Sequence, residues 1–116
     1  MKYESIRKMR RSEALTELRS GALDRVSTAL VSIALHEPDR KWVEDQIASH
    51  LLSPDPWVRG LAAVCAGHVA RIHRALDTAR LAPLIERLLD DADTRGRAED
   101  ALDDIEMFIG ALSTRS

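Results

Sequence analysis

Apolar residues recur along this chain three and four positions apart, which is the spacing of one face of an α-helix. Proline and aspartate divide the pattern into segments, because proline interrupts a helix and aspartate caps the first turn of the next one. No segment of useful length alternates apolar and polar residues as a half-buried strand does. The pattern predicts an all-α fold of about five to six helices, with neighbours antiparallel across short turns.

The first helix boundaries depend on a few residues. Ser12 is placed to cap a helix that begins at Glu13, and Gly21 interrupts it. A second helix begins at Ala22 and is stopped by Pro38. Residues 2–9 allow either a short charged helix or an irregular lead.

Aspartates mark the starts of the next helices. We expect Asp39 to cap one helix, and Asp55 to cap another in which Pro56 takes the first position. That helix ends near residues 74–75, and residues 77–78 can cap its successor. Pro83 predicts that this successor either starts late or is kinked. The last helix has these apolar residues: Ala98, Ala101, Leu102, Ile105, Phe108, Ile109 and Leu112.

The chain contains an approximate internal repeat, which indicates stacked helix pairs within a single domain, residues 1–116. The domain has a basic N-terminal lead at 1–11 and a tail at 113–116. A shift of 36 residues aligns similar residues in two segments: Asp55 with Asp91, Arg59 with Arg95, Gly60 with Gly96, Ala62 with Ala98, Val69 with Ile105 and Ile72 with Phe108.

Residues 55–69, DPWVRGLAAVCAGHV, are similar to the first helix of a HEAT repeat, with an acidic turn, a Val-Arg pair and paired alanines. Residues 81–89 resemble the second helix. The resemblance covers residues 22–112 and implies a short right-handed α-solenoid. In the second copy Glu99 replaces an alanine and Asp103 replaces a glycine, so we expect the last helix to be a polar cap.

Within such a repeat, several small and charged side chains of the segment 55–69 are explained by helix packing. Ala62, Ala63 and Gly67 let helices approach closely, and Arg59 is expected to pair with an acidic residue of a neighbouring turn. Trp57 has two interpretations, as a packing residue between repeats or as an anchor for a ligand.

The sequence shows no catalytic or cofactor motif. His68 and His73 are five positions apart, whereas two metal ligands on one helix face need a spacing of three or four. Cys65 lies in an apolar stretch and is interpreted as a buried residue rather than a reactive thiol, although His68 is within helical reach. We therefore expect no enzyme activity, no metal and no cofactor.

The net charge of −2 disfavours nucleic-acid binding, which needs a dominant basic field. The chain has no apolar run long enough for a signal peptide or a membrane span, so a cytoplasmic location is expected.

Acidic residues gather at the end of the chain. Residues 90–106 hold eight acids and only two basic residues, Arg95 and Arg97. This run is either a solvated end face or a docking surface for a basic protein, which it would attract over long range. The candidate partner-binding residues are Glu99, Asp100, Asp103, Asp104, Glu106, Trp57 and His68.

Two short motifs, Trp57-Val58-Arg59-Gly60 and residues 101–105, ALDDI, are similar to motifs of small bacterial immunity proteins of polymorphic toxin systems. That resemblance implies a non-enzymatic protein that covers a basic, nuclease-type toxin with acidic side chains. Two alternatives stay open: a structural or adaptor subunit of a larger assembly or homo-oligomer, and, less favoured by the charge balance, a nucleic-acid-binding HEAT protein.

Overall fold

A computed structural model describes residues 6–110 and shows an all-helical protein, as the sequence predicts. Within these residues there are six α-helices, one 3₁₀ helix and no strand. The helices are α1 (Arg11–Leu18), α2 (Leu23–His36), α3 (Arg40–Leu51), α4 (Pro56–His73), α5 (Thr78–Glu86), the 3₁₀ helix η2 (Arg87–Asp90) and α6 (Arg95–Phe108). The predicted tail, Leu112 and residues 1–5 of the basic lead lie outside the described residues. None of the described helices has the length and apolar character needed to span a membrane.

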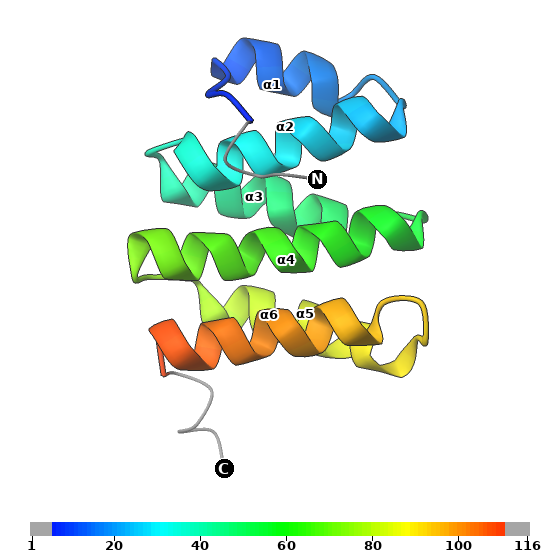
Figure 1. The fold of residues 1–116 in the computed structure, drawn as a ribbon, viewed down its shortest axis with the longest axis vertical. Helices are drawn as coiled ribbons and strands as arrows, with labels where there is room; N and C mark the ends of the chain where they lie inside the picture. The colour runs from blue at the N-terminus through cyan, green and yellow to red at the C-terminus, as the bar shows by residue number, and fades with distance from the viewer. Residues whose placement is uncertain (1–5, 111–116) are drawn as a thin grey trace.

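The helices succeed one another along the long axis of the molecule (Figure 1). Helices α1, α2, α4 and α6 lie nearer the viewer, and α3 and α5 lie behind them. Helix α4 is central, because it packs against α2, α3 and α6. Helices α4 and α6 run in the same direction, since Gly60 near the start of α4 lies beside Arg97 and Gly67 lies beside Asp104.

Three predicted helix caps are confirmed. Each aspartate lies just before a helix and accepts a hydrogen bond from a backbone N–H of the first turn, which would otherwise lack a partner. The bonds join Asp39 to Trp42 N at 3.2 Å, Asp55 to Trp57 N at 2.8 Å and Asp77 to Arg80 N at 3.2 Å.

One boundary prediction is wrong, and at a second boundary one of two alternatives is excluded. Helix α1 begins at Arg11 after an extended Arg10, so Ser12 lies inside the helix, where its carbonyl accepts a hydrogen bond from Thr16 Oγ1 at 3.0 Å. Helix α5 starts directly after its aspartate cap, so the late start expected from Pro83 does not occur.

The lead before α1 is not a free arm. Residues 6–10 are not helical, but the carbonyl of Arg7 accepts a hydrogen bond from Ser32 Oγ at 2.7 Å, and His36 Nε2 lies 2.8 Å from the carbonyl of Ile6. Met9 is buried in the core. Polar and apolar contacts therefore tie the described part of the lead to α2.

The core consists mainly of leucine, isoleucine, valine and alanine. Cys65 is fully buried among them, as predicted. Burial in this apolar setting raises the pKa of the Cys65 thiol to about 12, because the thiolate would lose its hydration. The cysteine is therefore a packing residue.

Glycines allow α4 and α6 to pack closely, as expected for Gly67. A Cβ at Gly67 would lie 3.0 Å from Asp104 Oδ2 and 3.3 Å from Asp104 Cβ, and one at Gly60 would lie 2.9 Å from Arg97 Cδ. A Cβ at Gly96, in the first turn of α6, would meet nothing within 4 Å. The two glycines of α4 therefore set the separation of these helices, and Gly96 does not.

These contacts predict opposite effects for two glycine substitutions. Gly67→Val should destabilise the protein by about 1–3 kcal/mol, because the branched side chain overpacks the contact with α6. Gly96→Ala should be neutral or stabilise it by up to about 1 kcal/mol, because alanine restricts the unfolded chain. Urea unfolding measures both. Equal effects would show that α4 and α6 do not depend on this close approach.

Candidate protein-binding face

Helix α6 separates its apolar and acidic residues. Ala98, Ala101 and Ile105 are buried against the rest of the molecule. The acids lie elsewhere on the helix: Glu99, Asp100 and Asp103 are exposed, and Asp104 and Glu106 are half-buried. These five acids of α6 are called the acidic face below.

The two arginines of α6 do not neutralise this acidic face. Arg95 Nε donates a hydrogen bond to the carbonyl of Leu89 at 2.8 Å. Arg97 Nη1 donates to the carbonyl of Trp57 at 3.3 Å, and its guanidinium lies 3.7 Å from the centre of the indole ring. Within residues 6–110, no carboxylate of the acidic face takes part in an ion pair. The negative charge of the acidic face is therefore not neutralised by ion pairs among these residues.

Glu106 differs from its neighbours. Its Oε2 atom is buried, and no hydrogen-bond partner for it occurs among the described residues. A buried carboxylate oxygen without a partner costs free energy, so this end of α6 is not arranged for maximum stability.

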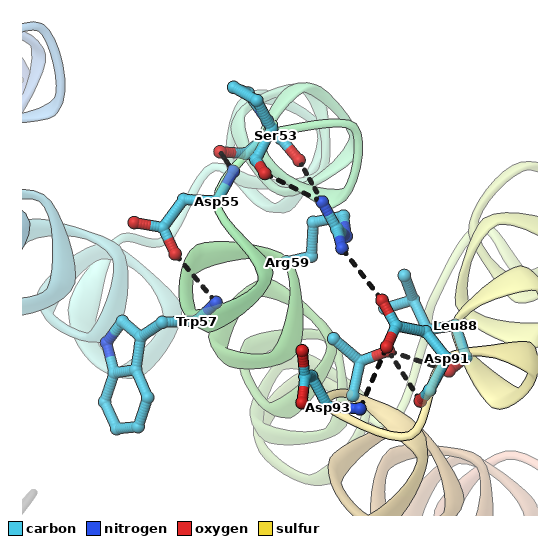
Figure 2. A network of polar contacts seen from close by, with 9 residues as sticks. Ser53, Asp55, Trp57, Arg59, Leu88, Asp91 and Asp93 are labelled. Carbon is cyan, nitrogen blue, oxygen red and sulfur yellow. Dashed lines mark hydrogen bonds and ion pairs between the residues drawn. The ribbon is translucent and has the colours of Figure 1, made fainter.

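The turn before α6 is organised by an arginine of α4 (Figure 2). Arg59 Nη1 donates to the carbonyls of Ser53 at 2.8 Å and Pro54 at 3.1 Å. Its Nη2 donates to Asp91 Oδ2 at 3.1 Å, which confirms the predicted pairing with an acidic residue of a neighbouring turn. Asp91 Oδ1 accepts a hydrogen bond from the backbone N–H of Asp93 at 2.9 Å. Arg59 thus joins the turn before α4 to the turn before α6.

Trp57 is fixed in place and yet exposed. Its Nε1 donates a hydrogen bond to Ser27 Oγ of α2 at 3.2 Å, and Arg97 of α6 covers the ring. The residue remains 45% exposed. These contacts confirm the packing interpretation of Trp57, and its role as an anchor for a ligand stays a prediction.

His68 lies half-buried on α4, on the side of Asp104. Arg71 Nη2 lies 3.3 Å from His68 Nδ1. Burial lowers the pKa of His68, the positive charge of Arg71 lowers it further, and the negative charge of Asp104 partly opposes both. The lowered pKa favours the neutral form of the His68 ring at pH 7.

The structure brings only some of the predicted partner-binding residues close together. It places Trp57 against Arg97, and His68 close enough to Asp104 for their charges to interact. Glu99, Asp103 and Glu106 project from other parts of the α6 surface. Sequence reasoning missed Arg97 and Ser27 as supports of Trp57. Gly60 lies inside a helix, where glycine is unusual. That glycine was the sequence signal that a long side chain of another helix, here Arg97, packs against this position.

Among residues 6–110, no group of three or more His, Cys, Asp or Glu side chains is arranged to hold a metal ion. The chemistry that this surface offers is noncovalent recognition by carboxylates, an indole and an imidazole.

Comparison with solved structures shows a likeness over nearly the whole chain. The chain is similar to a protein in the crystal structure of a CDI complex from Cupriavidus taiwanensis LMG 19424. The two share 32% sequence identity and a TM-score of 0.80, over 93% of this chain and 97% of the other. This chain belongs to the same family as that protein. No protein-family model and no curated protein matches the chain.

The likeness extends over nearly the whole of both chains, so it includes the turns and the last helix as well as the core. A TM-score of 0.80 shows that the relative has the same fold. The fold described above is therefore that of a protein found in a complex.

Substitution of Arg59 should loosen the link between the two turns. Arg59→Lys keeps the charge but loses the fork that donates to two carbonyls and a carboxylate, so we expect a loss of about 1–2 kcal/mol in the free energy of unfolding. Asp91→Asn should cost less, because the Arg59–Asp91 pair is partly exposed. A urea titration that shows no change for Arg59→Lys would contradict this role.

The burial of His68 predicts a titration below the usual range for histidine. The pKa of His68 is lowered in the folded state, so the unfolded state binds the proton more readily. The His68 contribution to stability is then complete above about pH 6.5 and is lost as the pH falls through the folded pKa. NMR titration of the His68 ring measures this, and a midpoint at or above about 6.5 would contradict it.

Proposed function

We propose that this protein is an immunity protein, which binds a basic toxin domain through the acidic face of α6 and neighbouring residues of α4 and so neutralises it. The proposal is supported by the matched protein, which is part of a CDI complex. CDI stands for contact-dependent inhibition, in which a toxin is paired with an immunity protein. The chain then acts in the cytoplasm as a binding protein and not as an enzyme.

The observation that carries the proposal is the unneutralised charge of α6. Arginines lie within the same helix, but they bind backbone carbonyls and an indole ring instead of carboxylates. Acids one turn apart on a helix, such as Glu99 and Asp103, repel each other by a few tenths of a kcal/mol. A chain that keeps this repulsion has a surface suited to a partner that supplies the opposite charge.

The repeat architecture supports the same proposal. We propose that the helices form HEAT-like pairs in a short solenoid, because α4 and α6 are related by the sequence shift and run in the same direction. Helix α6 is then the last first-type helix among residues 6–110. The acids at positions 99 and 103 stand where the preceding copy has an alanine and a glycine.

The proposed binding face combines two kinds of group. Trp57 contributes apolar area that is already held in place, and His68 contributes a neutral ring beside Asp104. The carboxylates of α6 attract lysines and arginines of the toxin. Inhibition follows when the bound chain covers the basic groups with which a nuclease-type toxin holds its substrate.

Charge reversal on α6 tests the proposal. Glu99→Lys, Asp100→Lys and Asp103→Lys together should weaken binding by about 100-fold or more, because three attractions become repulsions. These three side chains are exposed, whereas Asp104 packs against Gly67 and is left unchanged. The measurement is calorimetry with the toxin domain encoded beside this chain.

A matched control carries the same change of net charge elsewhere. Glu13→Lys, Glu37→Lys and Asp45→Lys alter acids in α1, after α2 and in α3 that form ion pairs. This variant should bind within about fivefold of the original chain, since α1 lies at the opposite end of the molecule from α6 (Figure 1) and the acid of α3 is already paired with Arg80. The proposal fails if the original chain does not bind the toxin, or if both variants bind equally.

A further inference from the structure

Two hollows flank the turn at Ser53 and Pro54, and both residues line each of them. The first, about 330 Å³, lies between this turn and the beginning of α2, with Leu23, Val26 and Val58 among its walls. The second, about 370 Å³, lies between this turn and α5–η2, and includes Leu52 and Leu84. The surface formed by residues 21–26 and 52–58 is called the turn edge below; Figure 2 shows part of it.

Exposed apolar side chains gather at this turn edge. Leu52 is 59% exposed, and Leu23 and Trp57 are each 45% exposed. Across the described residues only two other large apolar side chains are exposed, Ile72 and Met107, and both lie near the far ends of their helices. Large apolar side chains at the rim of a hollow are typical of a protein-binding surface.

The size of the proposed binding face indicates that the contact extends beyond α6. The acidic face, Trp57 and His68 make only seven residues, whereas a specific interface takes roughly 20–30 residues from each partner. Charged groups at a rim contribute mainly to the association rate, and buried apolar or aromatic anchors supply most of the affinity. The turn edge is continuous with the acidic face through Trp57, which contacts Arg97 of α6.

Charges of both signs lie at the turn edge. Asp24 and Asp55 are exposed there, and Asp93 is exposed in the adjoining turn. Arg59, which lines the second hollow, is already bound to Asp91 and to two carbonyls, so its charge is partly compensated. Arg25 of the turn edge and Arg87 of the second hollow are exposed as well, and Arg25 forms an ion pair with Glu17. The turn edge is therefore close to neutral overall, and its contribution to binding is apolar.

We propose, resting on the function proposed above, that the turn edge is the second contact area for the basic toxin and takes one apolar side chain of that partner on each side of Pro54. Leu23 and Leu52 line these two positions, and Trp57 joins them to the acidic face. The acidic face then governs how fast the partner arrives, and the turn edge governs how long it stays.

Kinetic measurement separates these two roles. Leu23→Ala combined with Leu52→Ala should raise the dissociation rate of the toxin by about tenfold or more and leave the association rate within about twofold. Ile72→Ala, which removes an exposed apolar side chain at the far end of α4, should change neither rate by more than about twofold. Both variants alter exposed positions, and circular dichroism verifies that they are folded.

Hydrogen exchange on the unaltered chain provides an independent test. On binding the toxin, the backbone amides of residues 21–24 and those of Leu52, Ser53 and Asp55 should become protected; Pro54 has no amide hydrogen. The inference is overturned if the toxin binds tightly while these amides stay unprotected, or if the leucine variant dissociates no faster than Ile72→Ala. Absence of any binding by the unaltered chain would instead overturn the proposed function, and this inference with it.

Discussion

The close packing of α4 against α6 is the constraint on which the rest of the structure depends. Gly60 and Gly67 leave room for the side chains of Arg97 and Asp104, so α6 approaches α4 more closely than larger residues would allow. Two arginine–aromatic contacts hold the pair at its ends: Arg97 over Trp57 at 3.7 Å, and Arg74 over the Phe108 ring at 4.9 Å. With one side of α6 committed to this contact, Glu99, Asp100 and Asp103 lie on the exposed surface, and Asp104 lies at the edge of the contact.

This packing also explains why the acidic face keeps its charge. The arginines closest to α6 are engaged in packing the helices together and in binding backbone carbonyls, so they are not available to the carboxylates. The protein thus keeps some like-charge repulsion and a buried oxygen of Glu106 without a partner among the described residues. Such costs to stability are usual where a surface is selected for binding.

Much of the fold could be predicted because its signals are local. Helical spacing of apolar residues and the aspartates at 39, 55 and 77 depend on neighbours within one turn, and the structure confirms those caps. Predictions failed where tertiary contacts decide: the cap expected at Ser12 gave way to an earlier helix start. The pairing of Arg59 with Asp91 could be expected from the repeat, but the position of Arg97 over Trp57 and the two hollows depend on how distant helices meet. The acidic residues were evident from the sequence, but coordinates were required to show that the five acids of α6 form no ion pair among residues 6–110.

The central claim is that the charge of α6 is neutralised by a basic partner and not by the chain itself. Stopped-flow measurement of toxin association at increasing salt tests it most directly, because screening acts on long-range attraction. We expect the association rate to fall by about tenfold or more between roughly 10 mM and 500 mM salt while the dissociation rate changes little. An association rate that is independent of salt would contradict it.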